Sequence, residues 1–354
     1  MRFKIGLIAA VLASSFGAAN AQQSSITVYG IVDAGARYGQ GLDSRNRPIA
    51  DSTSGLASGV SRTSRLGFRG SEDLGDGLSA IFNFEHGLNL DTGVQADAVK
   101  FWDRASYVGT KASWGTLTLG RQTNLMADTL GAIDPLNIRY AGYNPNVQFA
   151  SLSAHGHGLE FGSTGSTTGS YRLDNSVKYA LDLGAWSLKA MYGFGEGSGD
   201  NNSSKGLGAG YRSGAFSAQA AYMNLQANQR RELDAYIAGA AYSFSWGQIR
   251  GSYAGSKADL TATTTAEYRT ASLGVTAPLP GGLELTLSAY DVERKRSAQK
   301  DDGFLRGIAF LDYPLSRRTM VYAEFDHTRW RDGYQGAGNR DKATGLTLGV
   351  SHNF

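Results

Sequence analysis

Apolar and polar residues alternate along most of this chain. At residues 283–288 three leucines share one face, and polar side chains share the other. The same period of two returns at 321–326 and at 345–354. Because successive side chains of a β-strand point to opposite faces, this pattern predicts strands with one apolar and one polar face. A helix is predicted only briefly, around residues 124–130.

The connections between the predicted strands are of two kinds, which alternate along the chain. Tight connections carry Gly, Pro, Asp and Ser, which favour turns. The seven tight ones lie at 72–77, 112–115, 183–185, 213–215, 244–247, 278–282 and 313–317. The eight longer, polar ones lie at 39–61, 89–100, 122–170, 195–204, 225–231, 257–266, 293–301 and 329–342. These fifteen connections join sixteen strands.

This organisation predicts an all-β fold, a 16-stranded antiparallel transmembrane β-barrel with short periplasmic turns and long outer loops. An even strand number with short turns at one end and long loops at the other is typical of such barrels, and closure removes exposed sheet edges. Trp114, Trp186 and Trp246 stand at predicted strand ends, where interfacial girdles would lie. Alternation alone also permits a soluble β-sandwich. The chain is large for one sandwich, however, and no linker divides it.

The N-terminus has the three-part order of a secretory signal. Two basic residues begin it, an apolar stretch occupies 5–16, and a small-x-small tripeptide stands at 19–21. The apolar stretch is short for a membrane span, and no stop-transfer pattern follows it. We predict that residues 1–21 are a cleaved signal peptide and that 22–354 form the barrel domain.

Composition excludes several other classes of protein. Of 354 residues 47 are Gly, 11% are aromatic and 18% are charged, which does not fit a disordered chain. There is no Cys, so disulfides, zinc–cysteine sites and cysteine nucleophiles are excluded. Loss of Arg2 and Lys4 with the signal lowers the formal net charge from +3 to +1. Such a charge gives no reason to expect a nucleic-acid partner.

Several segments resemble the general-diffusion porins of Gram-negative bacteria, above all their beta-proteobacterial branch. Residues 28–33 (VYGIVD) look like the first strand, and 64–75 (SRLGFRGSEDLG) resemble the second strand and first periplasmic turn. Residues 107–121 resemble strands four and five, and 349–354 (GVSHNF) resemble the C-terminal strand ending in Phe. The resemblance covers essentially the whole mature chain.

The resemblance implies a homotrimeric outer-membrane channel for passive diffusion of ions and small hydrophilic solutes. It implies no enzymatic activity and no catalytic, cofactor or metal site. It also implies that the third loop, at 122–170, folds into the lumen as a constriction. Phe354 would be the assembly signal for the outer-membrane barrel assembly machinery. Outer-membrane lipid is a further partner. The basic run at 293–296 is predicted to be a solvated outer loop. The alternative is that this run contacts the phosphate groups of lipopolysaccharide.

Strand parity predicts which charged side chains face the lumen. If Leu66 and Phe68 face lipid, Arg65 faces inward, and the same reasoning turns Arg37 and Glu85 inward. An unpaired charge toward lipid would cost about 2–4 kcal/mol near the bilayer midplane.

One further arginine is placed by the next strand. Ala105 and Tyr107 are expected to face lipid, which leaves Arg104 inward. Arg121 is expected to point away from the lumen, where a subunit contact is one possible role.

The resemblance maps Arg65 and Arg104 onto a basic cluster at the constriction and Glu85 onto its carboxylate. The predicted constriction and lumen set is Arg37, Arg65, Arg104, Arg139, Glu85, Asp128 and Asp134, with the last two and Arg139 on the third loop. Loop carboxylates opposite the arginines would create a transverse field. The alternative is that the arginines only pair with wall carboxylates. Because the arginines cluster, we predict a weak anion preference.

Two other functions are possible for a chain of this pattern. A barrel enzyme of the phospholipase kind needs a lipid-facing Ser/His pair, and neither His327 nor His352 has an identifiable serine partner. A soluble β-sandwich binding protein is the second. His155 and His157 could bind a metal ion, but no third ligand is apparent.

Overall fold

The computed structural model describes residues 24–151, 171–195, 203–226 and 231–354. The strands are β1 (Ser24–Leu42), β2 (Pro48–Ser58), β3 (Arg65–Gly75), β4 (Leu78–Gly87), β5 (Ala105–Ala112), β6 (Gly115–Thr123), β7 (Arg172–Leu183), β8 (Trp186–Gly193), β9 (Ser204–Ser213), β10 (Phe216–Gln226), β11 (Glu232–Phe244), β12 (Gly247–Asp259), β13 (Thr265–Pro278), β14 (Glu284–Arg296), β15 (Asp302–Pro314), β16 (Thr319–Arg331) and β17 (Lys342–Asn353). The helices are α1 (Leu125–Ile133), α2 (Pro145–Ala150) and the 3-10 turn η3 (Pro280–Gly282).

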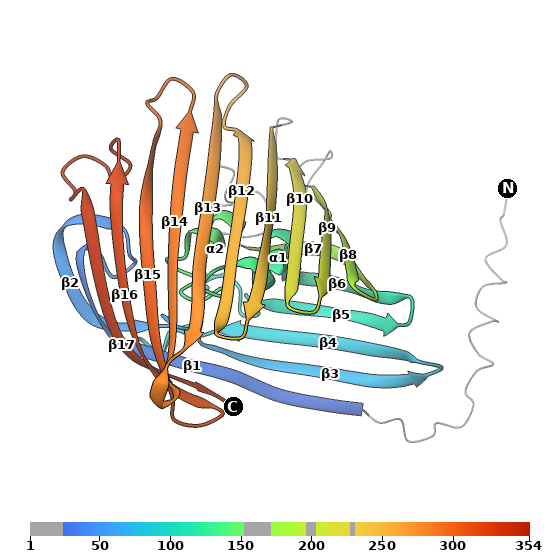
Figure 1. Ribbon diagram of the computed structural model, residues 1–354. Helices are drawn as coiled ribbons and strands as arrows, with labels where there is room; N and C mark the ends of the chain where they lie inside the picture. Colours follow the sequence, from blue (N-terminus) through green and yellow to red (C-terminus); the bar gives the residue numbers. More distant parts are fainter. Residues whose placement is uncertain (1–23, 152–170, 196–202, 227–230) are drawn as a thin grey trace.

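All strands belong to one antiparallel sheet that closes on itself (Figure 1). Closure comes from β1, whose residues 31–40 pair with β17. The opposite edge of β1 pairs with β2 through residues 34–42 and with β3 through residues 24–31. Since β2 and β3 follow one another along the same edge, they occupy a single strand position that is interrupted at 59–64. Seventeen segments therefore make sixteen strand positions, and the predicted 16-stranded barrel is confirmed.

The connections follow the predicted alternation of short turns and long loops. Each of the seven predicted tight turns joins two consecutive strands. The long loop expected at 39–61 is wrong, because β1 continues to Leu42 and β2 fills 48–58. The basic run at 293–296 is likewise the end of β14 rather than loop. Polar sequence predicts a loop at both places, but a hairpin that extends beyond the membrane can be polar on both faces.

The outer face of the wall is apolar. Leu207, Leu273 and Leu348 point outward and are 68%, 62% and 61% exposed, as suits side chains in contact with lipid. Trp114 and Trp246 are half exposed beside short turns, where the girdle was predicted.

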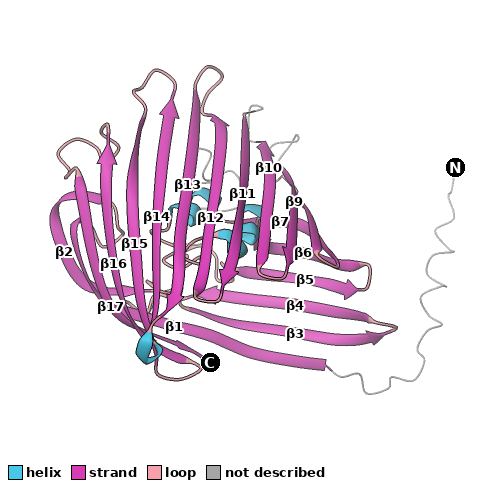
Figure 2. Ribbon diagram, viewed as in Figure 1, coloured by secondary structure: helices cyan, strands magenta, loops and turns pink. Residues whose placement is uncertain are grey.

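The helices α1 and α2 lie inside the ring of strands, whereas η3 lies in the turn between β13 and β14 (Figure 2). The predicted helix is confirmed as α1, which begins after Asn124, whose side chain accepts a hydrogen bond from the Ala127 N–H at 2.9 Å. None of the helices in the described residues has the length and apolar character needed to cross a membrane.

Candidate functional site

Residues 124–151, the described part of the segment between β6 and β7, fold into the barrel and cover part of its inner wall. Leu125, Leu130 and Ile133 of α1 pack against apolar side chains that β10 and β11 turn inward, such as Met223 and Ile237. Those inward positions are apolar because the third loop, not water, lies against them. The loop therefore fills one side of the lumen and leaves the channel on the other.

Asp134 holds the third loop together and does not line the open lumen. Its carboxylate accepts hydrogen bonds from the Ile138 N–H at 2.8 Å and from the Asn144 and Asn146 side-chain amides at 2.9 Å each. The Tyr290 hydroxyl of β14 donates to it at 3.2 Å. Burial raises the pKa of the Asp134 carboxyl. This residue thus differs from its predicted place at the constriction, because backbone and amide donors inside the loop satisfy its oxygens.

Asp128 links the loop to the neighbouring wall. It accepts hydrogen bonds from Lys178 of β7 at 2.9 Å, Lys189 of β8 at 3.2 Å and the Thr123 hydroxyl at 2.5 Å. Burial alone would raise the pKa of the Asp128 carboxyl, but the two ammonium groups outweigh it and hold the pKa below its usual value. Asp128 lines the lumen, and its charge is balanced there by both lysines.

Arg139 fastens the loop to the opposite wall. Its guanidinium forms two parallel hydrogen bonds with the Asp312 carboxylate of β15, at 2.6 and 2.7 Å, and lies over the Phe310 ring at 3.8 Å from the centroid. It also donates to the Ser61 hydroxyl at 3.1 and 2.9 Å. The loop thus bridges the barrel, with ion pairs to β7 and β8 on one side and to β15 on the other.

Arg37 points inward as predicted, but the loop covers it. It forms ion pairs with Glu324 at 3.0 Å and Asp326 at 2.7 Å, both on β16. Tyr140 and Tyr143 of the loop lie against its guanidinium, with ring centroids at 5.3 and 5.8 Å. Its side chain is 9% exposed, so it contributes to anchoring rather than to the open channel.

The open channel beside the loop is a hollow of about 640 Å³. Arg65, Arg104 and Arg172 surround Glu85 on one side of it. The Arg104 Nε donates to the Glu85 carboxylate at 2.6 Å, and an Arg65 nitrogen lies 3.8 Å from the same oxygen. The Tyr29 hydroxyl also donates to Glu85, at 2.9 Å.

Positive charge dominates this hollow. Seven basic residues line it against two acidic ones: Arg62, Arg65, Arg104, Arg139, Arg172, Lys178 and Lys189 against Glu85 and Asp128. The sequence reasoning missed four of the basic residues. Lys178 and Lys189 alternate with outward apolar residues on their strands and could have been found by parity. Arg62 and Arg172 lie outside the regular part of the alternation and gave no signal.

The parity assigned to β5 was wrong. Ala105 pairs with Glu85 and Tyr107 pairs with Asn83, so both face the lumen rather than lipid. Arg104 reaches Glu85 because it precedes the first residue of β5 and is not bound by the strand's alternation. The aromatic Tyr107 suggests a lipid-facing position, but its side chain lines the lumen.

Arg121 lies on the outer side of the barrel, as predicted from its parity. It donates to the Asp174 carboxylate at 2.6 Å and to the Asp103 carbonyl at 2.7 Å. Lys100, from the connection between β4 and β5, forms an ion pair with the same Asp174. This connection lies against the outer wall, where Phe101 stacks on His86 at 4.3 Å between ring centroids.

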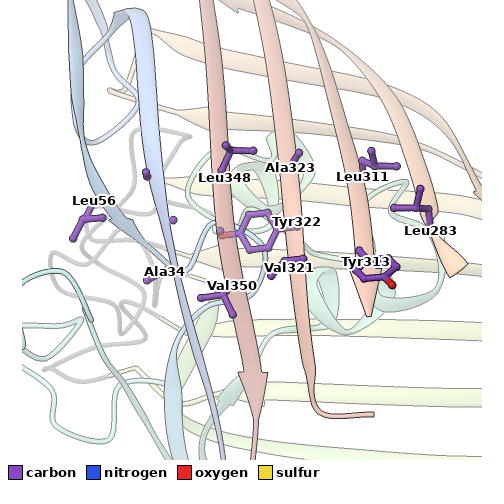
Figure 3. Close-up of a pocket in the computed structure, with 13 residues that line it drawn as sticks. Ala34, Leu56, Leu283, Leu311, Tyr313, Val321, Tyr322, Ala323, Leu348 and Val350 are labelled. Carbon is purple, nitrogen blue, oxygen red and sulfur yellow. The ribbon is translucent and has the colours of Figure 1, made fainter. Parts of the chain in front are cut away.

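A second hollow, of about 670 Å³, lies on the outer surface (Figure 3). Side chains of β1, β2 and β15–β17, such as Ala34, Leu56, Leu348 and Val350, line it, and no charged residue does. This apolar groove suits lipid or protein contact and not hydrophilic solutes. The charged inner hollow is therefore the candidate site for transport.

Comparison with known proteins decides the family. A family model described as Gram-negative porin matches residues 6–333. The chain belongs to the Gram-negative porins. It is accordingly an outer-membrane channel protein that crosses the membrane with its strands.

Individual relatives agree with this family. An outer membrane porin protein of Bordetella pertussis is 26% identical over 389 residues, covering 98% of this chain and 99% of the relative. Outer membrane porin protein 32 of Delftia acidovorans is 28% identical over 372 residues, with 99% and 100% coverage. Among solved structures, an anion-selective porin from Comamonas acidovorans has a TM-score of 0.76 and 25% identity, covering 94% of this chain and all of that one.

Neither alternative function finds support in this porin. The closed barrel replaces the β-sandwich. The imidazole of His327 bonds with the Thr344 hydroxyl at 3.0 Å, and that of His352 bonds with the Thr319 hydroxyl at 2.8 Å. The predicted signal peptide and the His155/His157 pair lie outside the described residues.

Proposed function

We propose that this porin forms a passive, non-enzymatic channel for small hydrophilic solutes and that its constriction prefers anions. The observation that carries the proposal is the charge of the inner hollow, with seven basic and two acidic residues. The two carboxylates are each shared between basic groups, Glu85 between Arg104 and Arg65 and Asp128 between two lysines.

Such a charge excess acts strongly in a narrow channel. Walls of low dielectric constant focus the field into the water, and charges within about one Debye length of 8–10 Å are poorly screened. Rings of arginine and lysine are a recurrent device for selecting anions. The transverse field expected from opposed charges is replaced here by a predominantly positive one, because Asp134 is buried inside the loop. The solved porin from Comamonas acidovorans, described as anion-selective, adds support by likeness.

Reversal potentials in a KCl gradient across a planar bilayer test the proposal. The wild type should pass Cl⁻ more readily than K⁺. Arg65→Gln and Arg104→Gln should each lower the Cl⁻/K⁺ permeability ratio, by about two- to threefold from the loss of one nearby charge. Arg318→Gln, exposed in a turn outside the hollow, is the control and should leave the ratio unchanged. A wild-type channel without anion preference would contradict the proposal.

We further propose the partners of this channel. It assembles as a homotrimer, is exported by its N-terminal 1–21 segment and is inserted by the barrel assembly machinery. Phe354 supports the last point, since its backbone exchanges hydrogen bonds with Gly30 at 3.1 and 3.2 Å where the barrel closes. Contact with lipopolysaccharide would fall to basic side chains at the outer end of β14, such as Lys295, whose side chain is 44% exposed.

A further inference from the structure

Between β2 and β3 the backbone leaves the wall and turns into the lumen at residues 59–64. β2 ends at Ser58 and β3 begins at Arg65, and both lie along the same edge of β1. Gly59 begins the interruption with a φ of +71°, a left-handed conformation that favours glycine. Residues 61–63 all line the inner hollow. We call residues 59–64 the inward turn.

Asp33 of β1 holds the inward turn at both of its ends. The Asp33 carbonyl accepts from the Gly59 N–H at 2.8 Å, and the Asp33 N–H donates to the Ser64 hydroxyl at 3.0 Å. The Asp33 carboxylate accepts from the backbone N–H groups of Ser61 at 3.3 Å and Arg62 at 3.0 Å. Asp33 is fully buried, so its charge is used to fix backbone and does not face the open water.

The inward turn contacts the third loop directly. The Ser61 hydroxyl accepts two hydrogen bonds from Arg139 of that loop. Arg62 is next in sequence, is exposed, and lies in the same hollow as Arg65. No carboxylate among the described residues forms an ion pair with Arg62, whereas Arg104 and Arg139 each have one. An unpaired guanidinium attracts a passing anion more strongly than a neutralised one.

We propose that Arg62 is a specificity-determining residue of this channel and that Asp33 is the positioning residue that holds it in the lumen. The proposal rests on the anion preference proposed above and assigns part of it to an element other than the third loop. The constriction then has two inward elements, and they meet where Arg139 contacts Ser61.

The first test neutralises Arg62. In assembled, heat-modifiable channels, Arg62→Gln should lower the Cl⁻/K⁺ permeability ratio by about two- to threefold. Arg69→Gln is the matched control, since Arg69 lies on β3, stacks over Tyr29 with a centroid distance of 5.1 Å and does not line the hollow. It should change the ratio less than Arg62→Gln does. If Arg62→Gln keeps the wild-type ratio and conductance, the proposal is overturned even when the wild type prefers anions.

The second test separates positioning from charge. Ser64→Ala removes a hydroxyl that bonds to the Asp33 backbone and changes no charge, so it should lower the ratio in the wild type and have no effect when Arg62 is already Gln. Asp33→Asn weakens the anchor and also removes a negative charge. In the Arg62→Gln background only the loss of negative charge remains, and the ratio should rise.

Equal effects of Ser64→Ala in both backgrounds would overturn the positioning role of Asp33. Because Ser64→Ala is a small change, it keeps the test valid should Asp33→Asn fail to assemble. A wild type that shows no anion preference would instead overturn the proposed function. That result comes from the unmutated protein, so it is distinct from the result of the variants.

Discussion

At the scale of single residues, Gly30 shows how closely the two ends of the chain meet. A Cβ on Gly30 would lie 2.3 Å from the Phe354 ring and 2.7 Å from the Arg65 carbonyl oxygen. The ring could rotate away, but the carbonyl belongs to the backbone of the adjoining strand. Glycine is therefore required for the approach of β1, β3 and the C-terminal residue.

We expect Gly30→Ala to reduce assembly of the barrel, because the added methyl group must displace the Phe354 ring and separate β1 from β3.

Deleting Phe354 should leave exported but unassembled protein, since the backbone bonds with Gly30 are lost as well. Heat-modifiable migration of outer-membrane fractions on gels measures both effects. Gly55→Ala is the control, because nothing lies within 4 Å of a Cβ there. Normal amounts of heat-modifiable protein from the Phe354 deletion would count against this role.

At the scale of elements, the third loop is a plug fixed on two walls. Asp128 bonds to lysines of β7 and β8, and Arg139 bonds to Asp312 of β15. These charge-assisted contacts join a loop to rigid strands, so the width of the open channel is set by wall geometry.

Asp128→Asn should change selectivity in the direction opposite to the arginine variants. It removes one negative charge from the hollow and leaves Lys178 and Lys189 unbalanced, so the Cl⁻/K⁺ permeability ratio should rise by about two- to threefold. Bilayer reversal potentials measure it. The low pKa of Asp128 means that the carboxylate is still ionised in mildly acidic solution, so the difference from wild type should persist there. A fall in the ratio would show that loosening the loop outweighs the charge.

The wall could be predicted from the sequence, and much of the lumen could not. Period-two alternation and turn residues predict the strands, because every second side chain of a strand contacts lipid and must be apolar. Side chains inside the barrel are under no such constraint. Tyr107 faces the lumen although it is aromatic. Asp134 is acidic, but its carboxylate accepts hydrogen bonds from its own loop and from Tyr290 of β14. Arg62 lies in an interruption of the strand whose backbone is held by hydrogen bonds to Asp33, 29 residues away in sequence.

At the scale of the whole molecule, the apolar groove beside β1 and β17 offers a surface on which a neighbouring subunit of the proposed homotrimer could pack. We expect crosslinking in mild detergent to yield trimers, and heating to dissociate them before electrophoresis. The boiled sample supplies the monomer reference. A monomer under all non-denaturing conditions would contradict the homotrimer.

The hydroxyl of Tyr322 reaches the Asp33 carboxylate at 2.9 Å across 289 residues of chain. Tyr322 lies on β16, so this bond requires strands from the two ends of the chain to have come together. Contacts so distant in sequence are slow to form in folding. The hold on the inward turn is thus completed at the last step of closure. An incompletely closed barrel would pass anions and cations alike. Selectivity between them would therefore be acquired when β1 pairs with β17.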